Sequence, residues 1–164
     1  MVHRDLGNIE VQVIMGKFDD SNLDLVVKAQ DIPLGLSPSG VIGAGGTVGG
    51  FGITIKEASS ADIVLQWPAV AIEDPDRREV LYQATKNALQ SAEEMDASKI
   101  GLFTMGLEVS RIPSWEIAEE IVQAIKEHSN GETTIRKVVI VVSSPIQMSS
   151  FQFALDNLIL VRQR

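Results

Sequence analysis

The chain has 164 residues, 45% of them hydrophobic, and a mean hydropathy of +0.12, which predicts one globular domain over residues 1–164. Its net charge of −8 disfavours nucleic acids and anionic membranes as partners, because both require a positive protein surface. The absence of cysteine excludes disulfides and thiolate chemistry. A polar N-terminal segment and the lack of a membrane-length apolar run further favour a cytoplasmic protein.

The first third of the chain predicts two strands and a glycine-rich loop. Alternating apolar residues predict a strand over Ile9–Met15, and the apolar run Leu23–Ala29 predicts a buried strand. The stretch Gly35–Gly52 then holds eight of the 13 glycines and no charged side chain. Because glycine weakens regular structure, this cluster indicates backbone that turns sharply or lies close to a ligand.

Two interpretations of the glycine-rich stretch remain open. Its backbone amides could cradle phosphates, or it could be a flexible connection. The stretch lacks two known nucleotide-binding motifs. A Walker loop requires a lysine, but no lysine lies between Lys28 and Lys56. The motif Gly-x-Gly-x-x-Gly starting at Gly43 would require a glycine where Val48 stands. We therefore expect no dinucleotide cofactor.

The rest of the chain alternates strands with helices, which predicts a three-layer α/β domain. Whether 52–56 is strand or helix is undecided from the sequence. The expected strands are Ala61–Trp67, Ala69–Ile72, Lys99–Thr104 and Val138–Val142. The expected helices run from Asp74–Asp76 to about Met95, from an N-cap at Ser114 to about His128, and over Ser149–Leu158, with Gly106–Pro113 as a loop.

The order of these motifs resembles that of the macro domain, the ADP-ribose-binding module, over nearly the whole chain. The family pattern G-D-I-T, D-A-I-V-N-A-A-N and G-G-G-V-x-G-A-I is similar, in turn, to Gly16–Asp19, Asp24–Asp31 and Ser39–Ala44. The later pattern S-I-A-F-P-x-x-x-T-G is similar to Lys99–Gly106, and Pro113 follows. The resemblance implies a macro-domain-like α/β/α fold with a mixed sheet. It also implies a cleft in which two loops hold ADP-ribose, or a related phosphate-bearing nucleotide, mainly by backbone amides.

Several side chains depart from the family pattern. Lys17 stands at the family's adenine-binding aspartate, and Lys28 and Asp31 stand at its asparagines. The second loop lacks the family's usual G-I-Y-G-Y-P sequence and carries Glu108 and Arg111 instead. Two other functions therefore stay open: a degenerate macro scaffold that serves protein interaction or assembly, including a homo-oligomer, and, less favoured, an ADP-ribosyl hydrolase.

The candidate binding residues come from the two loops that follow parallel strands, where α/β sheets bind ligands. They are Ser39, Gly40, Val41, Ile42, Gly43, Ala44, Thr104, Met105, Gly106, Leu107, Arg111 and Asp31. The residues of Gly40–Ala44 could equally make a tight turn, and Gly106 and its neighbours could be an ordinary strand-to-helix connection. Arg111 could be solvated, and Asp31 could form a surface ion pair with Lys28.

No catalytic residue, metal site or cofactor is expected. His3, placed near a mobile terminus, and His128 have no partner at metal-ligand spacing, and Ser39, Ser143 and Ser144 have no adjacent base. Whether the protein is an enzyme stays open.

Overall fold

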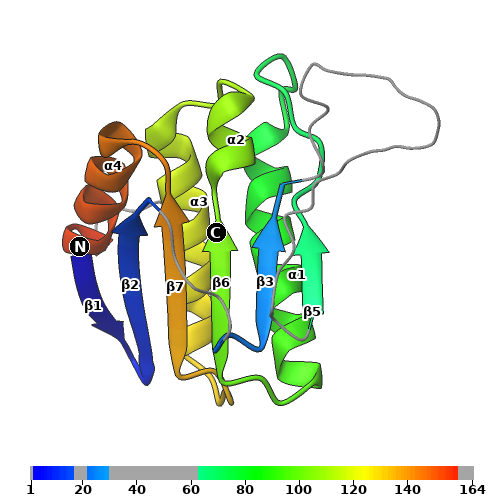
Figure 1. Ribbon diagram of the computed structural model, residues 1–164, viewed down its shortest axis with the longest axis vertical. Coiled ribbons are helices and arrows are strands. Elements are labelled where there is room, and N and C mark those ends of the chain that lie inside the picture. The colour runs from blue at the N-terminus through cyan, green and yellow to red at the C-terminus, as the bar shows by residue number, and fades with distance from the viewer. Residues whose placement is uncertain (1, 17–21, 30–62, 159–164) are drawn as a thin grey trace, which may run out of the picture.

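The computed structural model describes residues 2–16, 22–29 and 63–158, which build a mixed sheet backed by helices (Figure 1). Within these ranges the strand order is β1-β2-β7-β6-β3-β5. The strands are β1 (Val2–Leu6), β2 (Ile9–Met15), β3 (Leu25–Lys28), β5 (Ile63–Gln66), β6 (Lys99–Phe103) and β7 (Lys137–Val142). Strands β1 and β2 pair antiparallel, and the other described pairs are parallel.

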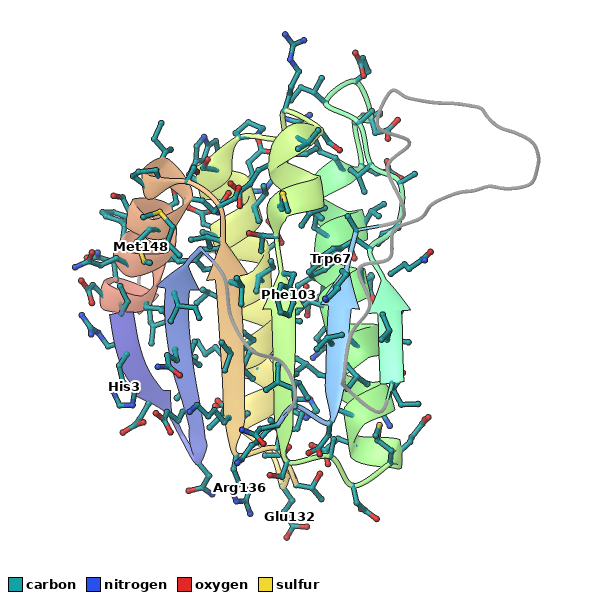
Figure 2. The ribbon with its side chains drawn as sticks, viewed as in Figure 1. His3, Trp67, Phe103, Glu132, Arg136 and Met148 are labelled. Atoms are coloured by element: carbon teal, nitrogen blue, oxygen red, sulfur yellow. The ribbon has the colours of Figure 1, made fainter. Side chains whose placement is uncertain are left out.

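Strand β1 was not predicted, and the expectation that His3 lies in a mobile terminus is wrong. A tight turn at Gly7, with φ of +60°, folds β1 back onto β2. In β1, His3 forms an ion pair with Glu10 at 2.8 Å between Nε2 and Oε2, and Figure 2 shows it at the outer edge of the sheet. The sequence of β1 does not show the alternation of a strand. Only its two ends, Val2 and Leu6, are buried, and three polar residues separate them.

Three long helices cover one face of the sheet, with α3 between the other two (Figure 1). They are α1 (Arg77–Glu94), α3 (Ser114–Ser129) and α4 (Pro145–Asp156). Their apolar stripes meet the sheet, and the predicted face of α3, Ile117, Ile121, Val122 and Ile125, is fully buried. A shorter helix, α2 (Met105–Val109), stands at the end of β6.

The opposite face of the sheet is also apolar. Side chains that alternate with those of the main core form a second buried cluster there, made of Leu23, Val26, Val139 and Val141 with Ile14 and Phe103 against it. A sheet with two apolar faces is what an α/β/α arrangement requires. The predicted fold class, α/β/α with a mixed sheet, is confirmed.

Several predicted boundaries are wrong. Residues 69–72 are not a strand, and the expected loop Gly106–Pro113 begins within α2. Pro113, not Ser114, is the N-cap of α3. Helix α4 begins at Pro145 rather than Ser149, because the Ser144 hydroxyl accepts a hydrogen bond from the Gln147 amide at 3.2 Å and proline suits the first turn.

Among the helices that the structure describes, none is long and apolar enough to cross a membrane. The undecided stretch 52–56 lies outside the described residues.

A partly buried carboxylate connects α1 to the segment that enters β7, at the end of the molecule opposite α2. Glu93 accepts hydrogen bonds from the Thr134 amide at 3.0 Å and from the Thr133 hydroxyl, and it pairs with His128 Nε2 at 2.7 Å. Burial raises the pKa of the Glu93 carboxyl, but the hydrogen bonds from Thr133, Thr134 and His128 outweigh it and lower that pKa from 4.5 to about 2. The ionised carboxylate therefore stabilises the fold.

Replacing Glu93 by glutamine is expected to lower the free energy of unfolding by roughly 2 kcal/mol at pH 7, because the amide cannot replace an ionised acceptor of several hydrogen bonds. Since the folded-state pKa lies below the unfolded one, this stabilisation is complete above pH 4.5 and is lost as the pH falls towards 2. Denaturant unfolding of wild type and variant at pH 7 and pH 3 measures it, with the exposed neighbour Glu94→Gln as control. A difference between wild type and variant that does not shrink at low pH would contradict the prediction.

Candidate functional site

Five parallel strands end at the same side of the sheet, which we call the carboxyl edge. The last residues of β2, β3, β5, β6 and β7 are Met15, Lys28, Gln66, Phe103 and Val142. The carboxyl edge comprises these strand ends and the residues that follow them. The register places these ends together, because Met15 pairs with Val142 and Lys28 with Gln66. In Figure 1 this is the upper edge, where α2 stands. Ligands of α/β sheets bind at such edges.

Helix α2 packs directly onto the end of β3. A Cβ added to Gly106 would lie 2.1 Å from Ala29 Cβ and 3.2 Å from Ala29 Cα. Only glycine permits this approach, so Gly106 serves close packing between β3 and α2. From the sequence, Gly106 was interpreted either as a ligand-binding residue or as part of an ordinary connection. Neither interpretation included its packing contact with Ala29.

The other described candidates at α2 divide into buried and exposed residues. Thr104 is fully buried and Leu107 nearly so, and both pack α2 against the sheet. Met105 is 58% exposed, and Arg111 is exposed with a left-handed φ of +69°. Met105 and Arg111 are therefore the members of this loop whose side chains are accessible to a ligand.

A cation lies at the end of β3. The Lys28 ammonium is 4.7 Å from the centre of the Phe103 ring. Close to this pair, the buried Trp67 donates its indole N–H to the Phe103 carbonyl at 2.8 Å, and its backbone amide donates to the Lys28 carbonyl at 2.9 Å. Figure 2 shows Trp67 and Phe103 near the upper ends of β3 and β6. Trp67 thus joins the ends of three neighbouring strands.

Glu108 was not predicted as a site residue, yet it connects the ends of β6 and β7. Its carboxylate accepts hydrogen bonds from the Thr104 hydroxyl at 2.7 Å and from the Ser143 hydroxyl at 2.6 Å. It also accepts one from the Ser143 amide at 3.2 Å. The four-residue spacing of Thr104 and Glu108 on a helix is readable from the sequence, whereas Ser143 is brought in by the sheet.

A groove lies on the helix-covered side between α1 and β5, and it reaches the carboxyl edge at Gln66 and Trp67. It is lined by Val27, Leu65, Gln66, Trp67, Pro68, Glu79, Val80, Gln83, Ala84, Asn87, Ala88 and Ser91. None of the described candidate binding residues lines it. Within the described ranges, no group of three His, Asp or Glu residues could hold a metal ion.

The candidates from the glycine-rich loop, Ser39, Gly40, Val41, Ile42, Gly43 and Ala44, together with Asp31, lie outside the described residues. That they share a cleft with Gly106–Arg111 stays a prediction.

No protein-family model matches this sequence, and no curated protein matches it. Solved structures do. The Oceanobacillus iheyensis macrodomain with ADP is 16% identical, matches with a TM-score of 0.68, and the match covers 96% of both chains. A point mutant of it with ADPR is 17% identical, with a TM-score of 0.68 over 96% of this chain and 98% of that one. The same macrodomain with MES bound is 17% identical, with a TM-score of 0.67 and 96% coverage of both chains.

These matches identify the class of fold, which is the macrodomain fold. The resemblance inferred from the motifs is thereby confirmed for the fold, at an identity that indicates a divergent sequence.

Proposed function

We propose that this protein is a binding module for ADP-ribose or a related phosphate-bearing nucleotide. The observation that supports the proposal is its match, over 96% of the chain, to macrodomain structures that contain ADPR or ADP. The ligand would lie at the carboxyl edge, near α2 and the end of β3, where backbone amides of the two loops would hold its phosphates.

The described part of the edge has the chemistry to accept such a ligand. The Lys28 ammonium supplies positive charge in a protein whose net charge is −8. A cation that contacts a phosphate forms a charge-assisted hydrogen bond, which is stronger than a neutral one. The Phe103 ring lies beside the Lys28 ammonium, and a cation–π contact favours this position near the edge.

We expect calorimetry to detect ADP-ribose binding, and the substitution Lys28→Met to weaken it by about 10- to 100-fold, the effect of losing a hydrogen bond to a charged group. Lys99→Met is the matched control, because Lys99 begins β6 at the opposite edge and should leave affinity unchanged. ADP-ribose and its guanine counterpart should bind within several-fold of each other, because Lys17 replaces the family's adenine-binding aspartate. A folded wild type that binds neither nucleotide at millimolar concentration would contradict the proposal.

One observation favours the alternative function, a macro scaffold that serves protein contacts. Large apolar side chains are exposed around the carboxyl edge and on the first turns of α3 and α4, namely Met15, Met105, Val109, Trp115 and Ile146. The calorimetric experiment discriminates the two, because a pure scaffold would not bind nucleotide.

A further inference from the structure

Three hydrogen-bond donors converge on one carboxylate at the carboxyl edge, between the ends of β6 and β7. Glu108 Oε2 accepts from the Thr104 hydroxyl at 2.7 Å and from the Ser143 amide at 3.2 Å, and Oε1 accepts from the Ser143 hydroxyl at 2.6 Å. We call these three donors the Glu108 niche. Thr104 is fully buried, so its hydroxyl has no water as a partner, and the other acceptor within reach, the Val141 carbonyl, is farther away at 3.3 Å.

A backbone N–H and two hydroxyls that point to one place are the groups with which proteins bind phosphate and carboxylate ligands. In this chain the protein itself supplies the anion, from the neighbouring helix α2. We infer that Glu108 is a built-in anion that fills an anion-binding niche at the carboxyl edge and thereby selects against highly charged ligands there. The selectivity rests on the proposed function, whereas the niche does not.

The consequence for a nucleotide is a restriction on where its phosphates lie. They are repelled from the β6–β7 end of the edge and confined to the β3–β6 end, where the Lys28 ammonium lies over Phe103. Two like charges several ångströms apart at a protein surface repel each other enough to change affinity by roughly tenfold. The effect grows with ligand charge, and ADP carries about one more negative charge than ADP-ribose because its terminal phosphate is not esterified.

Two substitutions separate the niche from the charge. Glu108→Ala empties the niche, and Glu108→Gln retains the shape while removing the charge. Glu132→Gln is the matched control, since it removes an exposed carboxylate at the far end of the molecule, where Figure 2 labels it.

The first experiment is chemical rescue of Glu108→Ala, measured by thermal unfolding in sodium formate and in sodium chloride at equal ionic strength. Formate should restore about half of the melting temperature that the substitution loses and should leave wild type and Glu132→Gln unchanged. Adding Ser143→Ala to Glu108→Ala should weaken the rescue strongly, because it removes one of the two hydroxyl donors that would hold the formate. Absence of formate rescue in a folded Glu108→Ala would overturn the inference.

The second experiment compares ligands by calorimetry. Glu108→Gln should bind ADP about tenfold more tightly than wild type does, with a smaller gain for ADP-ribose, and Glu132→Gln should show neither change. Should Glu108→Ala not fold, this experiment decides alone, and an ADP to ADP-ribose ratio unchanged in Glu108→Gln would overturn the inference.

The two proposals fail separately. A wild type that binds no nucleotide, with formate rescue intact, would support the niche and contradict the nucleotide-binding function. If wild type binds ADP-ribose, but formate does not rescue Glu108→Ala and Glu108→Gln does not change the preference between ADP and ADP-ribose, the nucleotide-binding function is supported and the niche is contradicted.

Discussion

Replacing Gly106 by valine is expected to destabilise the protein by about 3 kcal/mol and to weaken any ligand binding at the carboxyl edge. Even the first added atom, a Cβ, would lie 2.1 Å from Ala29 Cβ and 3.2 Å from Ala29 Cα. The obstructing atoms belong to the short side chain and backbone of Ala29 rather than to the end of a flexible side chain. Relief therefore requires α2 or the end of β3 to move, and both bound the proposed site.

Denaturant unfolding measures this prediction, and a second glycine provides the control. A Cβ added to Gly131 would meet no atom within 4 Å, so Gly131→Ala should be nearly neutral where Gly106→Ala is costly. Combining Gly106→Ala with Ala29→Gly removes the Cβ–Cβ clash and should recover part of the loss. If Gly106→Ala were as stable as Gly131→Ala, the close packing of α2 on β3 would be refuted.

Gly106 also shows why the site was harder to predict than the fold. Glycine is required both where backbone approaches a ligand and where one element touches another, so the residue type alone does not separate the two. Only the position of Ala29, brought alongside by β3, decides between them. The apolar run that became β7 carries no such ambiguity, because a continuous β-branched run has few alternatives to a buried strand.

The contacts at the carboxyl edge depend on strand register, which local sequence patterns do not reveal. Ser143 meets Glu108 across a separation of 35 residues, because β6 and β7 are neighbours in the sheet. The Lys28 ammonium lies over Phe103, at the end of the adjacent strand, a contact that local sequence does not reveal. Its expected ion pair with Asp31 stays a prediction, because Asp31 lies outside the described residues. Local spacing predicted most elements, and pairing between elements determined what each side chain contacts.

Replacing Trp67 by alanine is expected to cause the largest loss of stability among these substitutions, about 4 kcal/mol, because it leaves a cavity at the junction of three strands. The side chain is 2% exposed, and its indole N–H is a hydrogen-bond donor to the Phe103 carbonyl. That carbonyl would lose its partner, which accounts for roughly 1–3 kcal/mol of the expected loss where water cannot replace the donor.

Trp67→Phe separates packing from hydrogen bonding at this position, since it keeps most of the ring and removes the N–H. We expect a loss of about 1–2 kcal/mol for it, and less than about 1 kcal/mol for the control Trp115→Ala. Trp115 is 53% exposed and contacts the Arg78 guanidinium at 5.0 Å from the ring centre.

Unfolding should be followed by circular dichroism rather than by tryptophan fluorescence. The protein has two tryptophans, and the substitutions at Trp67 remove the buried one, which would report on unfolding. If Trp67→Phe unfolded at the same denaturant concentration as wild type, the indole bond to Phe103 would contribute nothing, and side-chain packing and the backbone bond to Lys28 would join the ends of β5, β3 and β6.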